Sequence, residues 1–273
     1  MSVEHERRLT TSDGVELVYG DYGPKTGEPV VLCHGLAAGG VQFTADAMEF
    51  ANLGYRVLVP DLRGHGRSAT PDPAAPRNYT IERMALDLLE VLDNAGTAEV
   101  HYVGNSLGGI LGLHLLKDHG RRFATLSTFG TSVALNLPGF TASLVPLSYR
   151  LTGPALAAKV TAWATTPSPE GRKIVEALIA KFDPQVGRAV VDAVSRYDLS
   201  ANVAHYSGPY LLIRGAKDRQ VNAALKLYLP DLRALPNFTL VDLPNAGHCA
   251  NLDAPAAFRT TLLDFWRRHP MRG

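Results

Sequence analysis

Ser106 lies in the most specific chemical motif of this 273-residue chain, Gly104-Asn105-Ser106-Leu107-Gly108-Gly109. The apolar run Val100–Val103 precedes the motif, and a helical pattern begins directly after it. In this strand–turn–helix setting, Gly-x-Ser-x-Gly is typical of a nucleophilic serine presented on a sharp turn above a sheet. The glycines are needed because a side chain two residues to either side would collide with a neighbouring strand or helix. Alone, the pattern also fits an ordinary turn with a capping serine, so the rest of the chain must decide.

A serine nucleophile needs a base, and the base needs an acid that orients it. Both follow in the chain in the order Ser, Asp, His that this arrangement uses. Asp218 comes just after the apolar run Tyr210–Arg214, and His248 comes just after the run Phe238–Leu243. We therefore predict a triad in which His248 takes the proton of Ser106 and Asp218 fixes the tautomer of His248.

The oxyanion formed by attack on a carbonyl needs two N–H donors. One is the backbone N–H of Leu107, at the start of the helix that follows Ser106, where negative charge is favoured. The second is predicted at Leu36, because His34-Gly35-Leu36 follows the apolar run Pro29–Cys33. Its neighbour Ala37 is the weaker candidate for this donor. His34 is interpreted as a buried residue that shapes the loop.

Short apolar runs that alternate with helical patterns surround these residues and predict a mostly parallel sheet. Asp13-Gly14 is predicted as a hairpin turn between the first two strands. Helices are predicted over Ile81–Ala95, Leu107–His119 and Ala254–Arg268, the last with Asp253 as its N-cap. The eight predicted strands are Arg7–Thr11, Val15–Tyr22, Pro29–Cys33, Arg56–Pro60, Val100–Val103, Ala124–Phe129, Tyr210–Arg214 and Phe238–Leu243.

A long interval from Ser132 to Ser207 interrupts this alternation, with helical segments punctuated by six prolines and no convincing strand. Parallel strands need a connection of only about a dozen residues, so we interpret the interval as an insertion. It is predicted to form a helical cap (132–207) over the carboxyl edge of the sheet, where ligands of such sheets bind. Residues 1–131 and 208–273 would form the core domain.

Composition narrows the function classes. The net charge is +1, from 27 basic and 26 acidic residues, which indicates neither a nucleic-acid partner nor an anionic membrane surface. The polar N-terminus and the lack of about 18 consecutive apolar residues predict a cytoplasmic protein without a membrane span. The two cysteines, Cys33 and Cys249, are interpreted as free thiols, and no Cys/His cluster has zinc spacing, so no metal is expected.

The chain resembles the α/β-hydrolase fold-1 family in the motifs above and in Pro60–Ser68, and the likeness covers almost the whole length, least in 132–207. The resemblance implies an α/β-hydrolase fold, an eight-stranded, mostly parallel sheet flanked by helices with an inserted helical cap. It also implies a serine hydrolase without a cofactor that acts on a small-molecule acyl substrate. In Pro60–Ser68 an Asp–Arg pair is expected to lock the loop rather than bind substrate.

The nucleophile separates the branches of that family. Its dehalogenases and epoxide hydrolases carry aspartate where this chain has Ser106, so both activities are disfavoured. In having Asn105 before the serine, the chain resembles the family members that hydrolyse C–C bonds of diketone acids. It differs from them in two places, because the loop at His34 lacks their glycine-rich extension and Cys249 replaces their usual aromatic residue. We therefore rank ester or lactone hydrolysis first, thioester hydrolysis with it, and C–C cleavage or acyl transfer second.

Two non-enzymatic functions are the alternatives to these activities. A ligand receptor that retains the triad and signals through its cap would show burst-and-stop kinetics with a lasting adduct. A nucleotide site at Gly104–Gly109 fails because the segment lacks both Gly-x-Gly-x-x-Gly and the Lys-Ser/Thr pair of a P-loop.

Substrate contacts are predicted at Gly35, Ala37, Asn105, Leu137, Trp163 and Cys249. An apolar pocket is further suggested by the cap residues Leu135, Phe140, Leu144, Leu147 and Tyr149. Arg150, Arg172 and Arg196 could meet a substrate carboxylate, although exposure on the cap is the default expectation for each. The sequence does not indicate the oligomeric state.

Overall fold

The computed structural model describes residues 5–271 and is built around one eight-stranded sheet in the order β1-β2-β4-β3-β5-β6-β9-β10. The six strands from β4 to β10 run parallel, and β2 pairs antiparallel with both β1 and β4. This confirms the predicted sheet. The strands are β1 (His5–Thr10), β2 (Glu16–Tyr22), β3 (Pro29–Cys33), β4 (Arg56–Pro60), β5 (Val100–Asn105), β6 (Phe123–Phe129), β9 (Tyr210–Gly215) and β10 (Phe238–Leu243).

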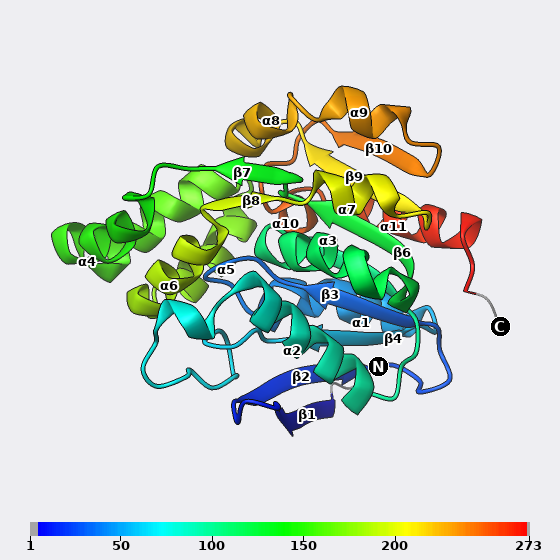
Figure 1. Cartoon of the computed structure of the whole chain (residues 1–273), viewed down its shortest axis with the longest axis horizontal. Coiled ribbons are helices and arrows are strands. Elements are labelled where there is room, and N and C mark those ends of the chain that lie inside the picture. The colour runs from blue at the N-terminus through cyan, green and yellow to red at the C-terminus, as the bar shows by residue number, and fades with distance from the viewer. Residues whose placement is uncertain (1–4, 272–273) are drawn as a thin grey trace.

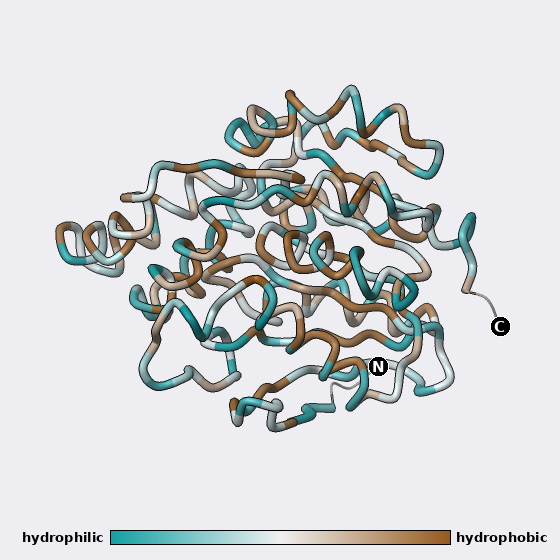
Figure 2. Tube along the Cα trace, in the orientation of Figure 1, coloured by the Kyte–Doolittle hydropathy of each residue, from teal (hydrophilic) through white to brown (hydrophobic). Residues whose placement is uncertain are grey.

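Helices cover both faces of the sheet, α2, α3 and α7 on one side and α1 and α11 on the other (Figure 1). The central strands β3, β4 and β5 are almost entirely buried and rich in β-branched residues, as expected for strands covered on both faces. Figure 2 shows hydrophobic residues concentrated along these strands and the helices against them. The helices here are α1 (Thr44–Asn52), α2 (Ile81–Asn94), α3 (Leu107–His119), α7 (Ser200–His205), α8 (Arg219–Leu225), α9 (Leu229–Ala234), α10 (Ala250–Asp253) and α11 (Pro255–Arg268).

The segment between β6 and β9 carries three further helices, which lie together beyond one end of the sheet (Figure 1). They are α4 (Thr141–Thr165), α5 (Pro169–Ile179) and α6 (Pro184–Val194). Helix α4 is kinked at Gly153, whose φ of 74° is not helical, directly before Pro154. The expectation that this segment lacks strands was wrong. Ala134–Asn136 (β7) and Arg196–Asp198 (β8) pair antiparallel, three residues each, too short to leave an alternating pattern.

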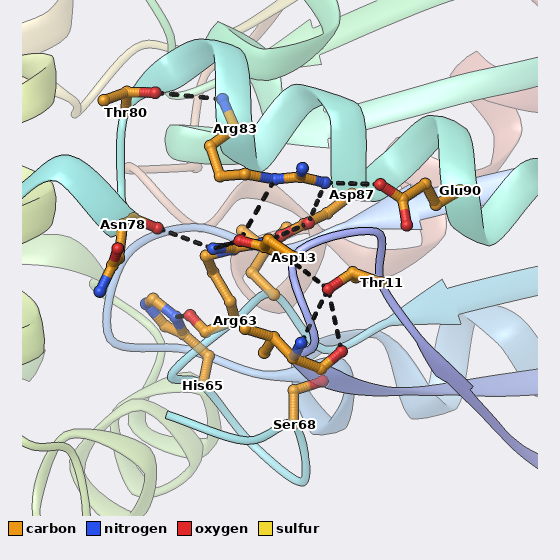
Figure 3. Close-up of polar contacts among 12 residues, drawn as sticks. Thr11, Asp13, Arg63, His65, Ser68, Asn78, Thr80, Arg83, Asp87 and Glu90 are labelled. Carbon is orange, nitrogen blue, oxygen red and sulfur yellow. Dashed lines mark hydrogen bonds and ion pairs between the residues drawn. The ribbon is translucent and has the colours of Figure 1, made fainter. Parts of the chain in front are cut away.

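A buried arginine holds the loop that follows β4 (Figure 3). The Arg63 side chain is fully buried and donates to both oxygens of Asp87 on α2, at 2.6 and 2.7 Å, and to Asp13 in the β1–β2 turn. In the same loop, Arg67 Nε donates to Asp61 Oδ2 at 2.8 Å. Burial without a partner would be costly for each of these charges, so the pairs fix the loop against the sheet. The predicted loop-locking role of an Asp–Arg pair is confirmed.

Candidate active site

Ser106 occupies the turn between β5 and α3 with φ 50° and ψ −112°, a left-handed backbone that is strained for a non-glycine residue. Its N–H donates to the carbonyl of Phe129 at 3.0 Å. A Cβ on Gly104 would lie 2.6 Å from the backbone of Gly108, and a Cβ on Gly108 would collide with the main-chain oxygen of Cys33. The steric reason given for the two motif glycines is therefore confirmed.

Asp218 and His248 form a direct pair beyond the ends of β9 and β10. Asp218 Oδ2 lies 2.8 Å from His248 Nδ1, and Asp218 Oδ1 accepts the N–H of Val221 as the N-cap of α8. Both carboxylate oxygens are thus engaged, and the Asp218 side chain is only 8% exposed. A neutral imidazole that donates from Nδ1 keeps its lone pair on Nε2, the tautomer that a general base requires.

The backbone of His248 is held from two sides. Its N–H donates to Thr165 at the end of α4 (2.9 Å), and its carbonyl accepts from Asn105 Nδ2 (3.1 Å). Asn105 Oδ1 accepts from Gln42 Nε2 at 3.0 Å, so both ends of the amide are occupied within the protein. Gly130 fits beside this contact, because a Cβ there would lie 2.8 Å from the carbonyl of His248. Asn105 therefore positions the histidine, and it also lines a cavity at Ser106, where a substrate contact was predicted for it.

The loop after β3 carries the second predicted oxyanion donor and two of the predicted substrate contacts. A Cβ on Gly35 would lie 3.1 Å from Ser106 Cβ, which places this loop against the serine. Ala37 adopts a left-handed φ of 57°. The N–H groups of Leu36 and Leu107 donate no hydrogen bond within the described part of the chain. His34 has the structural part expected of it, because its Nε2 accepts the N–H of Leu62 at 3.0 Å and burial lowers its pKa.

Asp253 ties the loop of His248 to the segment between β6 and β9. Its carboxylate accepts the N–H of Gly247 at 2.7 Å and that of Ser168 at 3.2 Å, and also the hydroxyl of Thr166. Burial raises the pKa of Asp253. The prediction that Asp253 caps the last helix was wrong, since the N-cap of α11 is Ala254. Its position beside a histidine loop carried no local signal of this role.

Two cavities meet at Ser106, and Leu36, Ser106 and His248 line both. The first, here called the cap-side cavity, has a volume of about 340 Å³ and lies against α4 and α5. The second, here called the α8-side cavity, has a volume of about 600 Å³ and lies between the start of α3, β7 and α8. The site can therefore hold a substrate that extends to both sides of the serine.

Most predicted substrate contacts lie in these walls. Gly35, Ala37 and Cys249 line the cap-side cavity, and Leu137 lines the α8-side cavity. Burial raises the pKa of Cys249 to about 12, so its thiol stays protonated and unreactive, as the interpretation of a wall residue requires. Trp163 was wrongly placed, because it is 62% exposed, lies outside both cavities and stacks with Arg172 at 3.6 Å.

Three further cap residues also proved wrong as pocket residues. Phe140, Leu144 and Leu147 are all at least 40% exposed on or beside α4. A helix that lies on the rim of a cavity turns only part of its apolar surface inward, and Val145 and Tyr149 occupy that part of α4. Tyr149 and Leu135, expected in the pocket, do line the cap-side and α8-side cavities.

Residues 5–271 hold neither a cluster suited to a metal ion nor a helix suited to span a membrane. No group of three or more His, Cys, Asp or Glu side chains in that range is arranged to hold a metal ion. None of the helices described there is long and apolar enough to cross a membrane.

A serine on a strained strand-to-helix turn, followed by an Asp–His pair at the ends of later parallel strands, defines an α/β hydrolase. The chain belongs to the alpha/beta hydrolase family, whose sequence profile matches residues 30–261. It is therefore a hydrolytic enzyme of this family.

Relatives along the whole length agree. The chain is 30% identical over 263 residues to a protein of Variovorax paradoxus (strain S110) named "Putative carbamate hydrolase RutD", covering 92% of this chain and 96% of that protein. A solved hydrolase from Pseudomonas aeruginosa PA01 is 27% identical with a TM-score of 0.81, over 96% and 98% of the two chains. A malate-bound thermophilic esterase from Thermogutta terrifontis is 25% identical with a TM-score of 0.84, over 98% and 100%.

Proposed function

We propose that the protein hydrolyses a small carboxylic ester or lactone through an acyl intermediate on Ser106. The observation that carries the proposal is the 2.8 Å contact between His248 Nδ1 and Asp218, with Ser106 and His248 in the walls of the same two cavities. The name of the Variovorax relative adds carbamates to the acyl compounds to be tested. Residues 132–207 would act as the cap that closes over the acyl compound.

The proposed reaction has two halves. Ser106 Oγ attacks the carbonyl carbon while His248 Nε2 takes its proton, and the N–H groups of Leu36 and Leu107 bind the resulting oxyanion. Each such donor contributes roughly 3–4 kcal/mol to lowering the barrier. The tetrahedral intermediate then expels the alcohol, which receives the proton from His248. Water, deprotonated by His248, attacks the acyl-serine in the same way and releases the acid.

The test is turnover of 4-nitrophenyl esters by Ser106→Ala. We expect kcat to fall by roughly 10⁴-fold or more, because alanine has no hydroxyl that His248 could activate as the nucleophile. Ser127→Ala is the matched control, since Ser127 is a fully buried serine of β6 that lines neither cavity. In parallel, a fluorophosphonate should add to Ser106 of the wild type, located by mass spectrometry. Turnover by Ser106→Ala at the wild-type rate would refute the proposal.

Product analysis separates this proposal from its alternatives with the same residues. Ester hydrolysis releases one acid and one alcohol in equal amounts and incorporates oxygen from labelled water into the acid. Transfer to an added alcohol, or cleavage of a carbon–carbon bond in a diketone acid, would instead support the second-ranked activities.

A further inference from the structure

Neither cavity at Ser106 offers a charged side chain to a substrate. Among the described residues that line them there is no Asp, Glu, Lys or Arg. The titratable groups in the walls are His248, Cys249, Tyr149 and Tyr197. Burial raises the pKa of both tyrosines, which therefore stay neutral. Apart from His248, the walls thus offer a substrate no side chain that carries a charge.

The polar side chains of the cap-side cavity are already engaged with the protein. Tyr149 donates to the carbonyl of Ile179 (3.2 Å), and Thr161 donates to that of Ala157 (2.9 Å). Thr165 donates to a carbonyl one turn earlier in α4. In the α8-side cavity, Tyr197 donates to the carbonyl of Ser132 at 3.0 Å. A carboxylate entering the cap-side cavity would compete with these bonds, and in the α8-side cavity the buried donor without a partner among the described residues is the neutral hydroxyl of Ser132.

The three cap arginines that could have met a carboxylate all lie elsewhere. Arg172 donates to the carbonyl of Thr166 at 3.0 Å and stacks on Trp163. Arg196 bonds to Asn136 at 3.2 Å and lines two other surface clefts. Arg150 is exposed on α4 and lines neither of the two cavities. No described arginine therefore reaches the space around Ser106.

We infer that the substrate is uncharged on both sides of its scissile bond and that the site discriminates against carboxylate-bearing acyl compounds. This inference rests on the proposed function and narrows its substrate class. A carboxylate that leaves water for either cavity loses its hydration and gains no cation, which costs far more than burying an alkyl or aryl group. Neutral esters and lactones pay no such penalty. Half-esters of dicarboxylic acids, diketone acids and the carbamate anion would all bind poorly.

The test compares substrates of equal length that differ in one terminal charge. For the acyl side, 4-nitrophenyl hexanoate is compared with the mono-4-nitrophenyl ester of adipic acid. For the alcohol side, 4-methylphenyl acetate is compared with 4-carboxyphenyl acetate. We expect kcat/KM of the wild type to be at least about 100-fold lower for the anionic member of each pair. Values within about threefold of each other would overturn the inference.

Variants that place a cation in a cavity should reverse the preference. Leu178→Arg in the cap-side cavity and Leu137→Arg in the α8-side cavity each put a guanidinium at a half-buried wall position. Each should raise the anionic-to-neutral ratio of kcat/KM at least about tenfold for the substrate pair whose charge enters that cavity. Leu178→Gln and Leu137→Gln are the matched uncharged controls. An unchanged ratio in both folded arginine variants would count against the inference.

The outcomes also separate this inference from the proposed function. A wild-type enzyme that requires Ser106 but cleaves both members of each pair equally well would refute the inference alone. Turnover of the neutral esters that survives Ser106→Ala would refute the proposed function. If an arginine variant fails to fold, the wild-type ratios still decide the question.

Discussion

Strain and hydrogen bonding at single residues prepare this site for chemistry. Ser106 adopts a left-handed conformation on a tight turn. Glycines make this turn possible, because added Cβ atoms at Gly104 and Gly108 would collide with nearby backbone. Asp218 uses one oxygen to cap α8 and the other to bind His248. Because the N-cap hydrogen bond to Val221 fixes the carboxylate of Asp218, the orientation of the imidazole is set before any substrate arrives.

Asp218→Asn should therefore remove activity while the protein stays folded. The amide oxygen can still cap α8, but an amide opposite Nδ1 favours the wrong tautomer of His248, and we expect kcat to fall by roughly 10⁴-fold. Initial rates with a neutral 4-nitrophenyl ester give the measurement. Asp242→Asn is the matched control, because Asp242 forms an exposed ion pair with Arg214. A loss of less than about tenfold in Asp218→Asn would show that Asp218 does not orient the base.

Three separate elements meet at Arg63, which joins the β1–β2 turn, the loop after β4 and helix α2 (Figure 3). Arg63 holds the pKa of Asp13 down to about 2. Arg83 and Glu90 extend the same network along α2. This loop also reaches the segment between β6 and β9, where the His65 ring lies 4.8 Å from that of Phe182, a residue of the cap-side cavity wall. The network therefore supports the cavity indirectly.

Breaking the network from α2 should destabilise the whole domain. Asp87→Ala leaves the fully buried guanidinium of Arg63 with only Asp13, whose side chain is 36% exposed, as its counterion, and we expect a loss of about 3–5 kcal/mol in the free energy of unfolding. Urea unfolding followed by circular dichroism gives the value. Asp93 lies on the same helix as Asp87, and Asp93→Ala, which breaks its solvent-accessible pair with Arg122 before β6, should cost less than about 1 kcal/mol. Equal losses in the two variants would contradict this account.

The stability of the whole molecule should depend on buried neutral histidines. Burial lowers the pKa of His34, lowers that of His65 to about 3 and lowers that of His101 to about 4. The unfolded chain binds protons at these positions near its ordinary pKa of about 6.5, whereas the folded protein does not. Protons therefore favour unfolding, and the contribution of these groups to stability is lost as the pH falls from about 7 toward 4.

His65→Asn tests this dependence, because the amide can still donate to the carbonyl of Arg63, the partner of His65 Nδ1, but does not titrate. We expect its free energy of unfolding to fall less than that of the wild type between pH 7 and pH 5, by about 2 kcal/mol for one histidine. Urea titrations at both pH values supply the comparison. Parallel pH curves for wild type and variant would show that His65 is not neutral in the folded protein.

Local patterns in the chain were sufficient to predict the strands of the sheet and the order in which Ser106, Asp218 and His248 follow them. All eight strands lie where they were predicted, and the central strands β3, β4 and β5 are the clearest because their burial on both faces makes each one a short apolar run. Ser106 follows β5 directly, and Asp218 and His248 lie in the loops just after β9 and β10. Since the ends of parallel strands share one edge, sequence position alone brought Asp218 and His248 to the same region as the serine turn.

Residues that act through distant partners could not be found in this way. Gln42, Gly130 and Asp253 hold the site through contacts with residues 63, 118 and 85 positions away along the chain, respectively. Their own neighbours carry no trace of those contacts. Trp163 shows the converse error, since an aromatic residue on a helix looks alike in sequence whether the helix turns it inward or outward.

The sequence by itself determined the hydrolase family, because the motifs around Ser106, Asp218 and His248 are each encoded within a few residues at strand ends. Only the tertiary structure decided which side chains surround the reacting serine. It turned Arg150, Arg172 and Arg196 away from the two cavities and left uncharged walls. The orientation of a side chain in the segment between β6 and β9 depends on how α4, α5 and α6 pack, and such packing sums many weak contacts between distant segments.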